Sequence, residues 1–256
     1  MTLSKSGHIG FLSGNALKLI ACAFMFVDHF GVIFFPTQLI YRVIGRLAFP
    51  LFAFMIAEGA KYTRNKLRYF LTVAIFAAAV EGGYYVLFKG FIYSVFSTFA
   101  FSIIMIYTLD LFKRMIFDKQ RSIPMILLSG ILFAGSVTLT YFISEKFPFD
   151  YGFFGALMPV FASLFRMPEN APEKLKAFDN HLIHVAMIAL GILIHVYVYS
   201  RVIQNYYVVQ LHALMSLPFL LLYSGKRGRL RMKYFFYIFY PTHISILQII
   251  YWIITR

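Results

Sequence analysis

The chain alternates long apolar stretches with short polar ones. The apolar segments cover residues 14–35, 43–60, 69–88, 91–112, 123–144, 152–165, 181–203, 205–223 and 234–254. Most of them are close to the roughly 20 residues that a helix needs to cross the hydrocarbon core of a bilayer. The pattern therefore predicts an all-α protein, a polytopic transmembrane helical bundle with nine spans, eight or ten being the alternatives.

Two places in this pattern need a finer interpretation. Segment 152–165 is short and contains Pro159, which predicts a broken or re-entrant helix. Segments 69–88 and 91–112 are separated only by Lys89 and Gly90, which predicts a tight antiparallel hairpin.

Composition supports a membrane protein without a separate soluble domain. The residues are 61% hydrophobic and only 13% charged, whereas soluble domains are about half apolar and about a quarter charged. The longest polar stretch, residues 166–180, is short enough to be a loop. We therefore expect residues 1–256 to form one integral membrane domain.

The distribution of basic residues predicts the orientation. Lys and Arg gather in residues 61–68, 113–121, 166–176 and 226–233, and Lys5 precedes the first segment. By the positive-inside rule, these loops and the N-terminus are expected on the cytoplasmic side. The formal net charge is +14, but no basic domain stands apart from the spans, so we expect contact with lipid headgroups and no nucleic-acid partner.

Several common site types are missing from the sequence. The single Cys22 excludes an intramolecular disulfide and a multi-cysteine metal site, and no HExxH helix, GxSxG elbow or Walker loop occurs. We therefore expect no metal. The apolar run continues beyond Ala21-Cys22-Ala23, so the first span is interpreted as an uncleaved anchor.

The first span carries a cation, a carboxylate and an imidazole, namely Lys18, Asp28 and His29. Ionisable groups are expensive within a bilayer and usually have a function. Lys18 and His29 are eleven positions apart, which places the two side chains within about 20° of one helix face and about 16 Å apart along the axis. An extended coenzyme A could bridge them, although a lysine at this position could also simply snorkel to the headgroups.

Asp28 and His29 point about 100° apart on a helix, so each needs a partner from another span. The candidate partners are charged or imidazole side chains in the other segments: Arg42, Arg46, Glu58, Glu81, His195, His212 and His243.

Five stretches carry a family resemblance: DHFG at 28–31, GRLAFPLFAFMIAEG at 45–59, TRN at 63–65, DYG at 150–152 and FYPTH at 239–243. Together they resemble the motifs of the TraX family, which is named for a protein that N-acetylates conjugative pilin. That family is similar to a wider group of membrane acyltransferases, which includes lysosomal heparan N-acetyltransferase and bacterial polysaccharide O-acetyltransferases. In that group ten residues often stand between a basic residue and a catalytic histidine, a pattern that Lys18 and His29 match.

The resemblance implies transfer of an acetyl or other acyl group from cytoplasmic acetyl-CoA or another acyl-CoA. The acceptor would be an amine or hydroxyl of a membrane-associated peptide, a pilin-like protein or a surface glycan, with N-acetylation expected first. The enzyme would be a multi-pass protein of a bacterial cytoplasmic membrane, in contact with the lipid bilayer.

The expected site combines these residues in three roles. His29 is the expected general base or transient acyl carrier, and the sequence leaves these two roles open. The full set is His29, Asp28 and Glu81 as catalytic residues; Lys18, Arg46 and Glu58 on the side of the acyl-CoA; and His243 and Tyr151 as acceptor-side or supporting residues.

Two other classes of function are the alternatives. A proton-coupled transporter or channel could employ the buried Asp, Glu and His side chains as a relay. A non-catalytic membrane component of a secretion or conjugation assembly would need no such relay at all.

Overall fold

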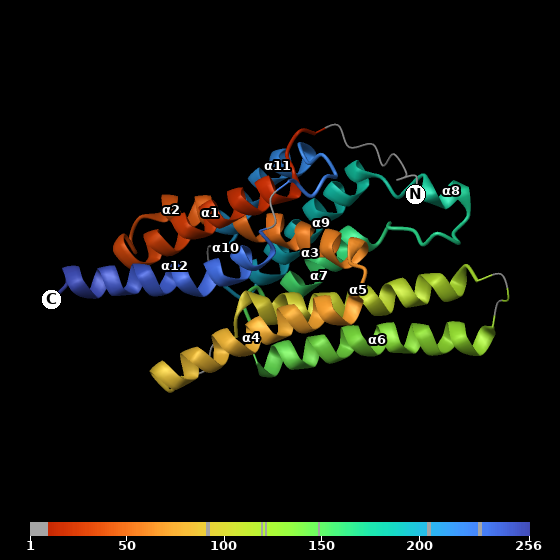
Figure 1. Cartoon of the computed structure of the whole chain (residues 1–256), viewed down its shortest axis with the longest axis horizontal. Helices are drawn as coiled ribbons and strands as arrows, with labels where there is room; N and C mark the ends of the chain where they lie inside the picture. Colours follow the sequence, from red (N-terminus) through yellow and green to blue (C-terminus); the bar gives the residue numbers. More distant parts are fainter. Residues whose placement is uncertain are drawn as a thin grey trace. The chain divides into compact units, whose positions relative to one another are not determined.

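A computed structural model describes residues 10–90, 93–118, 120, 122–147, 149–203, 206–229 and 232–256, and its regular elements over these ranges are all helical (Figure 1). Outside helices, the described backbone forms one isolated bridge, between Leu12 and Tyr223. The elements are α1 (Gly14–Phe34), α2 (Leu39–Gly45), α3 (Ala48–Tyr62), α4 (Lys66–Phe88), α5 (Val95–Ile116), α6 (Ile123–Lys146), α7 (Gly152–Ser163), α8 (Glu173–Lys176), α9 (His181–Ser200), α10 (Tyr206–Gln210), the 3₁₀-helix η1 (Leu211–Ser216), α11 (Leu217–Leu221) and α12 (Lys233–Ile254).

Seven helical segments in the described part of the chain are long and apolar enough to cross a membrane. They are α1, the combined α2–α3 stretch Leu39–Tyr62, α4, α5, α6, α9 and α12. The polytopic helical class predicted from the sequence is thereby confirmed. The cytoplasmic position of the N-terminus stays a prediction.

Two of the nine predicted segments form shorter helices. Segment 152–165 gives the 12-residue α7 with Pro159 inside it. Segment 205–223, which we expected to cross as one helix, is instead divided into α10, η1 and α11. Pro218, near the start of α11, cannot donate a backbone hydrogen bond, and the 3₁₀ segment Leu211–Ser216 before it interrupts the α-helical pattern.

The second predicted span is bent at Arg46 and Leu47, between α2 and α3. The ring nitrogen of Pro50 has no hydrogen to donate to the carbonyl of Arg46, so one helical hydrogen bond is lost at this point. The Leu47 N–H donates to the Ile44 carbonyl instead, at 3.2 Å. This break lets α2 carry Arg42 and Arg46 at its own angle to α1.

The tight connection after α4 begins as expected. Lys89 adopts the left-handed conformation, with φ 55°, and its N–H donates to the Tyr85 carbonyl at 2.9 Å. Residues 91–92 of the predicted hairpin lie outside the described residues, as do Lys5, Lys119, Arg121 and Arg231 of the basic segments.

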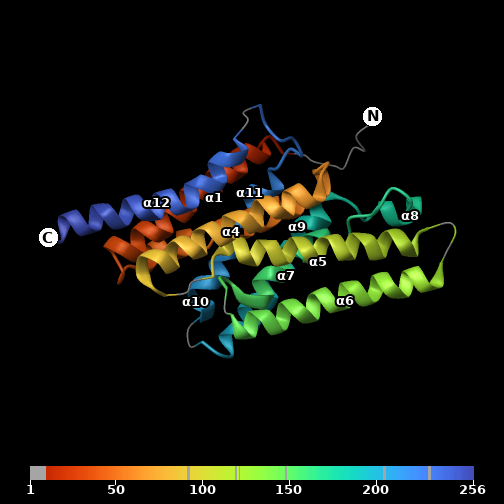
Figure 2. The ribbon, with the colours of Figure 1, turned by 60° about the horizontal axis from the view of Figure 1, so that its bottom comes forward.

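The described chain divides into two compact units, which are Met1–Met55 with Ile192–Arg256, called unit 1 here, and Ile56–Gly191, called unit 2. In unit 1, α1 packs against α2 and α12 (Figures 1 and 2). In unit 2, α5 packs against α4, α6 and α7. That the whole chain is one functional domain stays a prediction.

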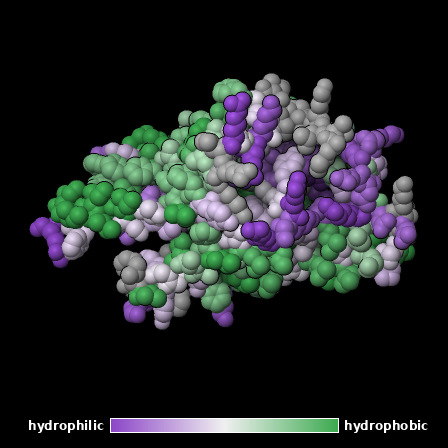
Figure 3. Space-filling view, in the orientation of Figure 1, coloured by the Kyte–Doolittle hydropathy of each residue, from purple (hydrophilic) through white to green (hydrophobic). Residues whose placement is uncertain are grey.

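The helices present large apolar side chains outward. In unit 2, α6 exposes Leu127, Ile131 and Phe142, and in unit 1 the end of α12 exposes Trp252 and Ile253. Figure 3 shows hydrophobic residues gathered over both helices. Such surfaces suit contact with lipid and would be unfavourable in water.

The α1–α2 packing depends on two glycines. A Cβ on Gly45 would lie 2.1 Å from Oδ1 of Asp28, and a Cβ on Gly31 would lie 2.0 Å from Cβ of Tyr41. Both distances are far below van der Waals contact, so the absence of a side chain lets the two helices approach closely.

We expect Gly45→Ala to destabilise the protein by about 1–3 kcal/mol, because the added methyl group pushes α2 away from the Asp28 carboxylate. Thermal unfolding of the purified protein in detergent measures this. Gly135→Ala is the matched control, since a Cβ there meets nothing within 4 Å and alanine favours the helix. Equal unfolding temperatures of the two variants would contradict the packing argument.

Candidate functional site

Two histidines from distant parts of the chain meet in unit 1. His29 of α1 and His243 of α12 are 214 residues apart, yet Nδ1 of His29 lies 2.7 Å from Nε2 of His243. Their ring centroids are 4.9 Å apart. The sequence offered His243 as one of several partners for His29, and the structure selects it.

Aromatic rings surround this histidine pair. Phe239 stacks on His243 at a centroid distance of 4.7 Å, and Tyr240 meets the His29 ring edge-on at 6.2 Å. The Phe26 ring lies 6.4 Å from that of His243. His243 is buried and His29 is half-buried, so His29 is the more exposed imidazole of the pair.

Asp28 is held by the two arginines of α2. Nη1 of Arg42 lies 2.7 Å from Oδ2 of Asp28, and Nη2 of Arg46 lies 3.5 Å from Oδ1. One carboxylate between two guanidinium groups leaves an excess positive charge next to α1. Asp28 therefore fixes α2 against α1, and its expected catalytic role stays a prediction.

Lys18 lies near the other end of α1, with its ammonium 5.3 Å from the centroid of the Phe236 ring. Among the residues that the structure describes, no carboxylate pairs with Lys18. A cation–π contact is weak at an exposed site and stronger when the ammonium is desolvated. The Lys18 charge is thus held in place without being neutralised.

A basic segment crosses the N-terminus of α1. The Gly14 and Asn15 N–H groups donate to the carbonyls of Lys226 and Arg227, at 2.7 and 3.0 Å. The side chains of Lys226 and Arg227 are exposed. Together with Lys18, they place three cations at the end of the helix where the backbone dipole is also positive.

Glu81 lies in unit 2, where it joins α4 to the start of α5. Its Oε1 accepts hydrogen bonds from the Ser94 N–H at 2.8 Å, the Ser94 hydroxyl at 3.1 Å and the Ser97 hydroxyl at 2.5 Å. A carboxylate at a helix N-terminus is a favourable cap. This geometry gives Glu81 a structural task, and its expected catalytic role stays a prediction.

Glu58, also in unit 2, forms an ion pair with Arg166. Both side chains are buried, and Nε of Arg166 also donates to the Ala162 carbonyl at 3.2 Å. A buried ion pair that loses one partner leaves an uncompensated charge, at a cost of about 3–5 kcal/mol. Glu58 therefore stabilises the position of Arg166 just after α7.

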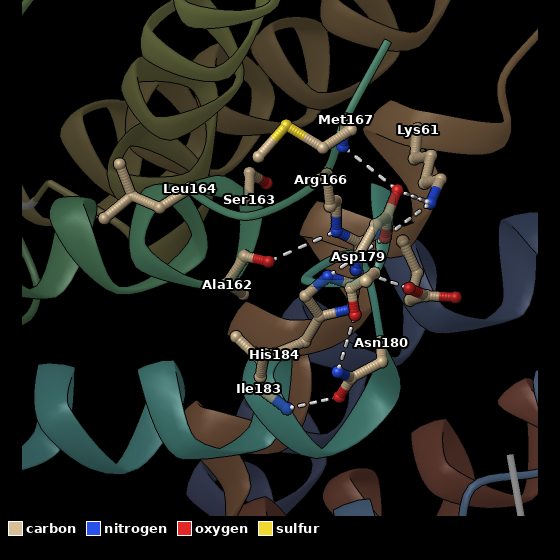
Figure 4. Close-up of polar contacts among 12 residues, drawn as sticks. Lys61, Ala162, Ser163, Leu164, Arg166, Met167, Asp179, Asn180, Ile183 and His184 are labelled. Atoms are coloured by element: carbon tan, nitrogen blue, oxygen red, sulfur yellow. Dashed lines mark hydrogen bonds and ion pairs between the residues drawn. The ribbon is translucent and has the colours of Figure 1, made fainter. Parts of the chain in front are cut away.

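The segment after α7 is tied down by Asp179, shown in Figure 4. Oδ2 of Asp179 lies 3.2 Å from Nζ of Lys61 and accepts from the Met167 N–H at 3.0 Å, while Oδ1 lies 3.2 Å from Nε2 of His184. Asn180 begins α9 by accepting from the Ile183 N–H at 3.0 Å. Burial alone would raise the pKa of Asp179, but the His184 imidazole, the Lys61 charge and the Met167 N–H hold it well below its usual range.

Lys113 caps the C-terminal end of α7. Its ammonium donates to the carbonyls of Ser163, Leu164 and Arg166, at 2.7, 2.6 and 3.1 Å. The three donors of one ammonium thus satisfy carbonyls that lack helical partners. In the sequence, Lys113 and Arg166 counted only as loop charges, and Asp179 was not singled out. The signal that could have pointed to Asp179 is its position beside Asn180, a favourable helix N-cap, with His181 and His184 following in the first turn of the helix.

Tyr151 lies at the turn into α7. It adopts the left-handed conformation with φ 63°, and its carbonyl accepts from the Gly155 N–H at 2.9 Å. The neighbouring Asp150 carbonyl accepts a hydrogen bond from the Thr98 hydroxyl of α5. The DYG motif thus builds a turn in unit 2, and a role of Tyr151 toward an acceptor stays a prediction.

The described chain has apolar spans, a histidine pair between two of them, and a cation without a carboxylate partner on one of the same helices. These features define a multi-pass helical membrane protein with a polar site between α1 and α12. A family model described as TraX protein matches residues 13–251. The chain therefore belongs to the TraX family. Searches of curated proteins and of solved structures returned no match.

The low pKa of Asp179 predicts a pH-dependent stability. A carboxylate whose pKa is lowered by folding stabilises the protein above the pKa of the unfolded chain, near 3.9, and this stabilisation is lost as the pH falls toward the folded value. Asp179→Asn should therefore lower the free energy of unfolding by roughly 1–3 kcal/mol at pH 7, and the difference from wild type should shrink below about pH 4.

Unfolding in detergent at several pH values measures this difference. Glu173→Gln is the control, because the Glu173 side chain is 87% exposed and its pair with Lys176 is expected to contribute little. A deficit of Asp179→Asn that stays constant down to pH 3 would show that the carboxylate charge is not the cause.

Proposed function

We propose that this TraX-family protein is an integral membrane acyltransferase. It moves an acetyl or other acyl group from acyl-CoA to an amine or hydroxyl of a membrane or extracytoplasmic acceptor, with N-acetylation the first expectation. No metal takes part in this proposal. The observation that carries it is the reachable imidazole of His29, backed by the buried His243 and placed on the same helix as the unneutralised Lys18.

The donor is proposed to enter at the Lys18 end of α1. Acyl-CoA carries phosphates at one end and a thioester at the other, so it needs cations at one place and a base at another. Lys18, Lys226 and Arg227 supply positive charge at the N-terminus of α1. His29 follows about 16 Å further along the helix axis, which supports a ligand extended along α1.

The proposed reaction needs one base. The acceptor nitrogen of an amine attacks the thioester carbon, a C–N bond forms, the C–S bond breaks, and the coenzyme leaves as a thiolate. The proton that the amine loses passes to Nε2 of His29 and then to the thiolate sulfur, which gives an amide and free CoA thiol. A neutral imidazole can accept a proton on one ring nitrogen and release it again, so it can perform both transfers.

In the proposal, the remaining predicted residues have structural roles, each within its own unit. Arg46 acts through Asp28 by fixing α2 on α1, and Glu58 acts through Arg166 at the end of α7. These contacts favour a supporting role over direct contact of either residue with the donor. Glu81 and Tyr151 shape the starts of α5 and α7.

The location follows from the same proposal. The basic loops favour donor binding from the cytoplasm, because acyl-CoA is made there and cannot cross a sealed bilayer freely. The acceptor would be a membrane-associated peptide, a pilin-like protein or a surface glycan at a bacterial cytoplasmic membrane.

The test is acceptor-dependent release of CoA thiol by the purified protein from acetyl-CoA, with a panel of peptide amines and glycan hydroxyls as acceptors. His29→Ala should lower turnover at least about 10²-fold, since it removes the base. His212→Ala is the control and should retain turnover. Turnover of His29→Ala near that of wild type would refute the role of His29, and no thiol release with any acceptor would favour a transporter or an assembly component.

A second variant tests the donor end. Lys18→Ala should raise the KM for acetyl-CoA by up to roughly a hundredfold with a smaller change in kcat, because its charge lies too far from His29 to join bond making. Lys18→Arg should retain more affinity than Lys18→Glu. Lys146→Ala, an exposed cation at the end of α6, is the control. An unchanged KM in Lys18→Glu would mean that Lys18 only snorkels.

A further inference from the structure

We propose that His243 is a positioning residue that fixes the tautomer of His29, so that Nε2 of His29 carries the free lone pair, and that it shares the proton which His29 takes up. This inference rests on the proposed function for its catalytic meaning, whereas the tautomer itself can be measured without any activity.

The chain of hydrogen bonds starts at a backbone carbonyl. Nδ1 of His243 lies 2.6 Å from the carbonyl oxygen of Phe239, one helical turn earlier in α12. A carbonyl oxygen can only accept a hydrogen bond. Nδ1 of His243 must therefore carry a hydrogen and donate it.

The orientation of this first bond determines the second. A neutral imidazole with a hydrogen on Nδ1 has a lone pair on Nε2, so Nε2 of His243 accepts. The atom 2.7 Å from it is Nδ1 of His29, which must then be the donor. The hydrogen of neutral His29 thus stays on Nδ1, and its Nε2 is left as an acceptor for a substrate proton.

The burial of the two rings agrees with these roles, because His243 is covered and His29 is more exposed. The His243 side chain is 4% exposed and is covered by the stacked Phe239 ring, so it has little access to a substrate. His29 is half-buried. The more exposed imidazole, His29, therefore has its lone pair on Nε2. The covered imidazole, His243, uses both of its nitrogens in hydrogen bonds that orient the pair. This is the arrangement in which an orienting group selects the productive tautomer of a base.

The pair can also distribute charge. When Nε2 of His29 takes a proton from the acceptor, the Nδ1 hydrogen of His29 can move to Nε2 of His243. His243 is then the imidazolium, with one hydrogen donated to the Phe239 carbonyl and the other to Nδ1 of His29. The reverse movement returns the hydrogen to His29, whose Nε2 proton is released to the thiolate. No hydrogen is gained or lost over the cycle.

The direct test is ¹⁵N NMR of the histidine side chains in the purified wild-type protein in lipid, at a pH where both rings are neutral. Resonances are assigned by comparison with His29→Gln and His243→Gln. We expect Nδ1 of both rings to be protonated and Nε2 of both to be unprotonated. A hydrogen on Nε2 of His29 in the neutral wild-type pair would overturn the inference.

Two substitutions separate positioning from proton sharing. His243→Gln keeps an oxygen that can accept from Nδ1 of His29, so the tautomer should be retained. His243→Leu removes the acceptor, and the His29 signal should then show a mixture of tautomers or protonation at Nε2. His212→Leu is the matched control and should leave the His29 signal unchanged. An unaltered His29 tautomer in His243→Leu would show that His243 does not set it.

Kinetic measurements then test whether His243 contributes to catalysis. His243→Leu should lower kcat roughly 10²-fold or more with little change in the KM for acetyl-CoA, and His243→Gln should lie between this variant and wild type. Equal losses in the two variants would refute the contribution of positioning. If the protein transfers no acyl group at all, the proposed function fails while the NMR result still decides the tautomer.

Discussion

In an apolar bundle, an ionisable side chain must find its partner in the protein, because no bulk water is there to provide one. Asp28 with the α2 arginines, Glu81 with two serines and Glu58 with Arg166 all follow this rule. Each such contact joins two helices that the chain connects only distantly or through a turn. The polar contacts therefore determine which helices meet, while the apolar surfaces favour burial in lipid without specifying neighbours.

Breaks in helices supply the geometry that these contacts need. Pro50 separates α2 from α3, so the short α2 can lie against α1 and bring both arginines to one carboxylate. Gly31 and Gly45 remove the bulk that would keep the two helices apart. The same logic holds in unit 2, where Lys113 satisfies the open carbonyls at the end of α7. Irregular backbone is tolerated where side chains replace the missing hydrogen bonds.

Hydropathy was sufficient to predict the helical class and seven of the segments, because length and apolar content decide whether a helix can span. At 205–223 it predicted one long helix, whereas the described part of this run forms α10, η1 and α11, an interruption that hydropathy alone does not detect. Within the site, helical spacing placed Lys18 and His29 on one face and separated Asp28 from His29. It could not choose among three distant histidines for His29, since that choice depends on how α12 packs against α1.

His29 and His243 are 214 positions apart in the sequence, and this separation also affects the order in which the site is assembled. A membrane protein is inserted as it is synthesised, so α1 enters the bilayer long before α12 exists. Until then the first helix holds an imidazole with neither His243 nor the basic segment that contacts Gly14 and Asn15. A chain interrupted before α12 would thus lack the contact between His29 and His243, which can form only after α12 has been made.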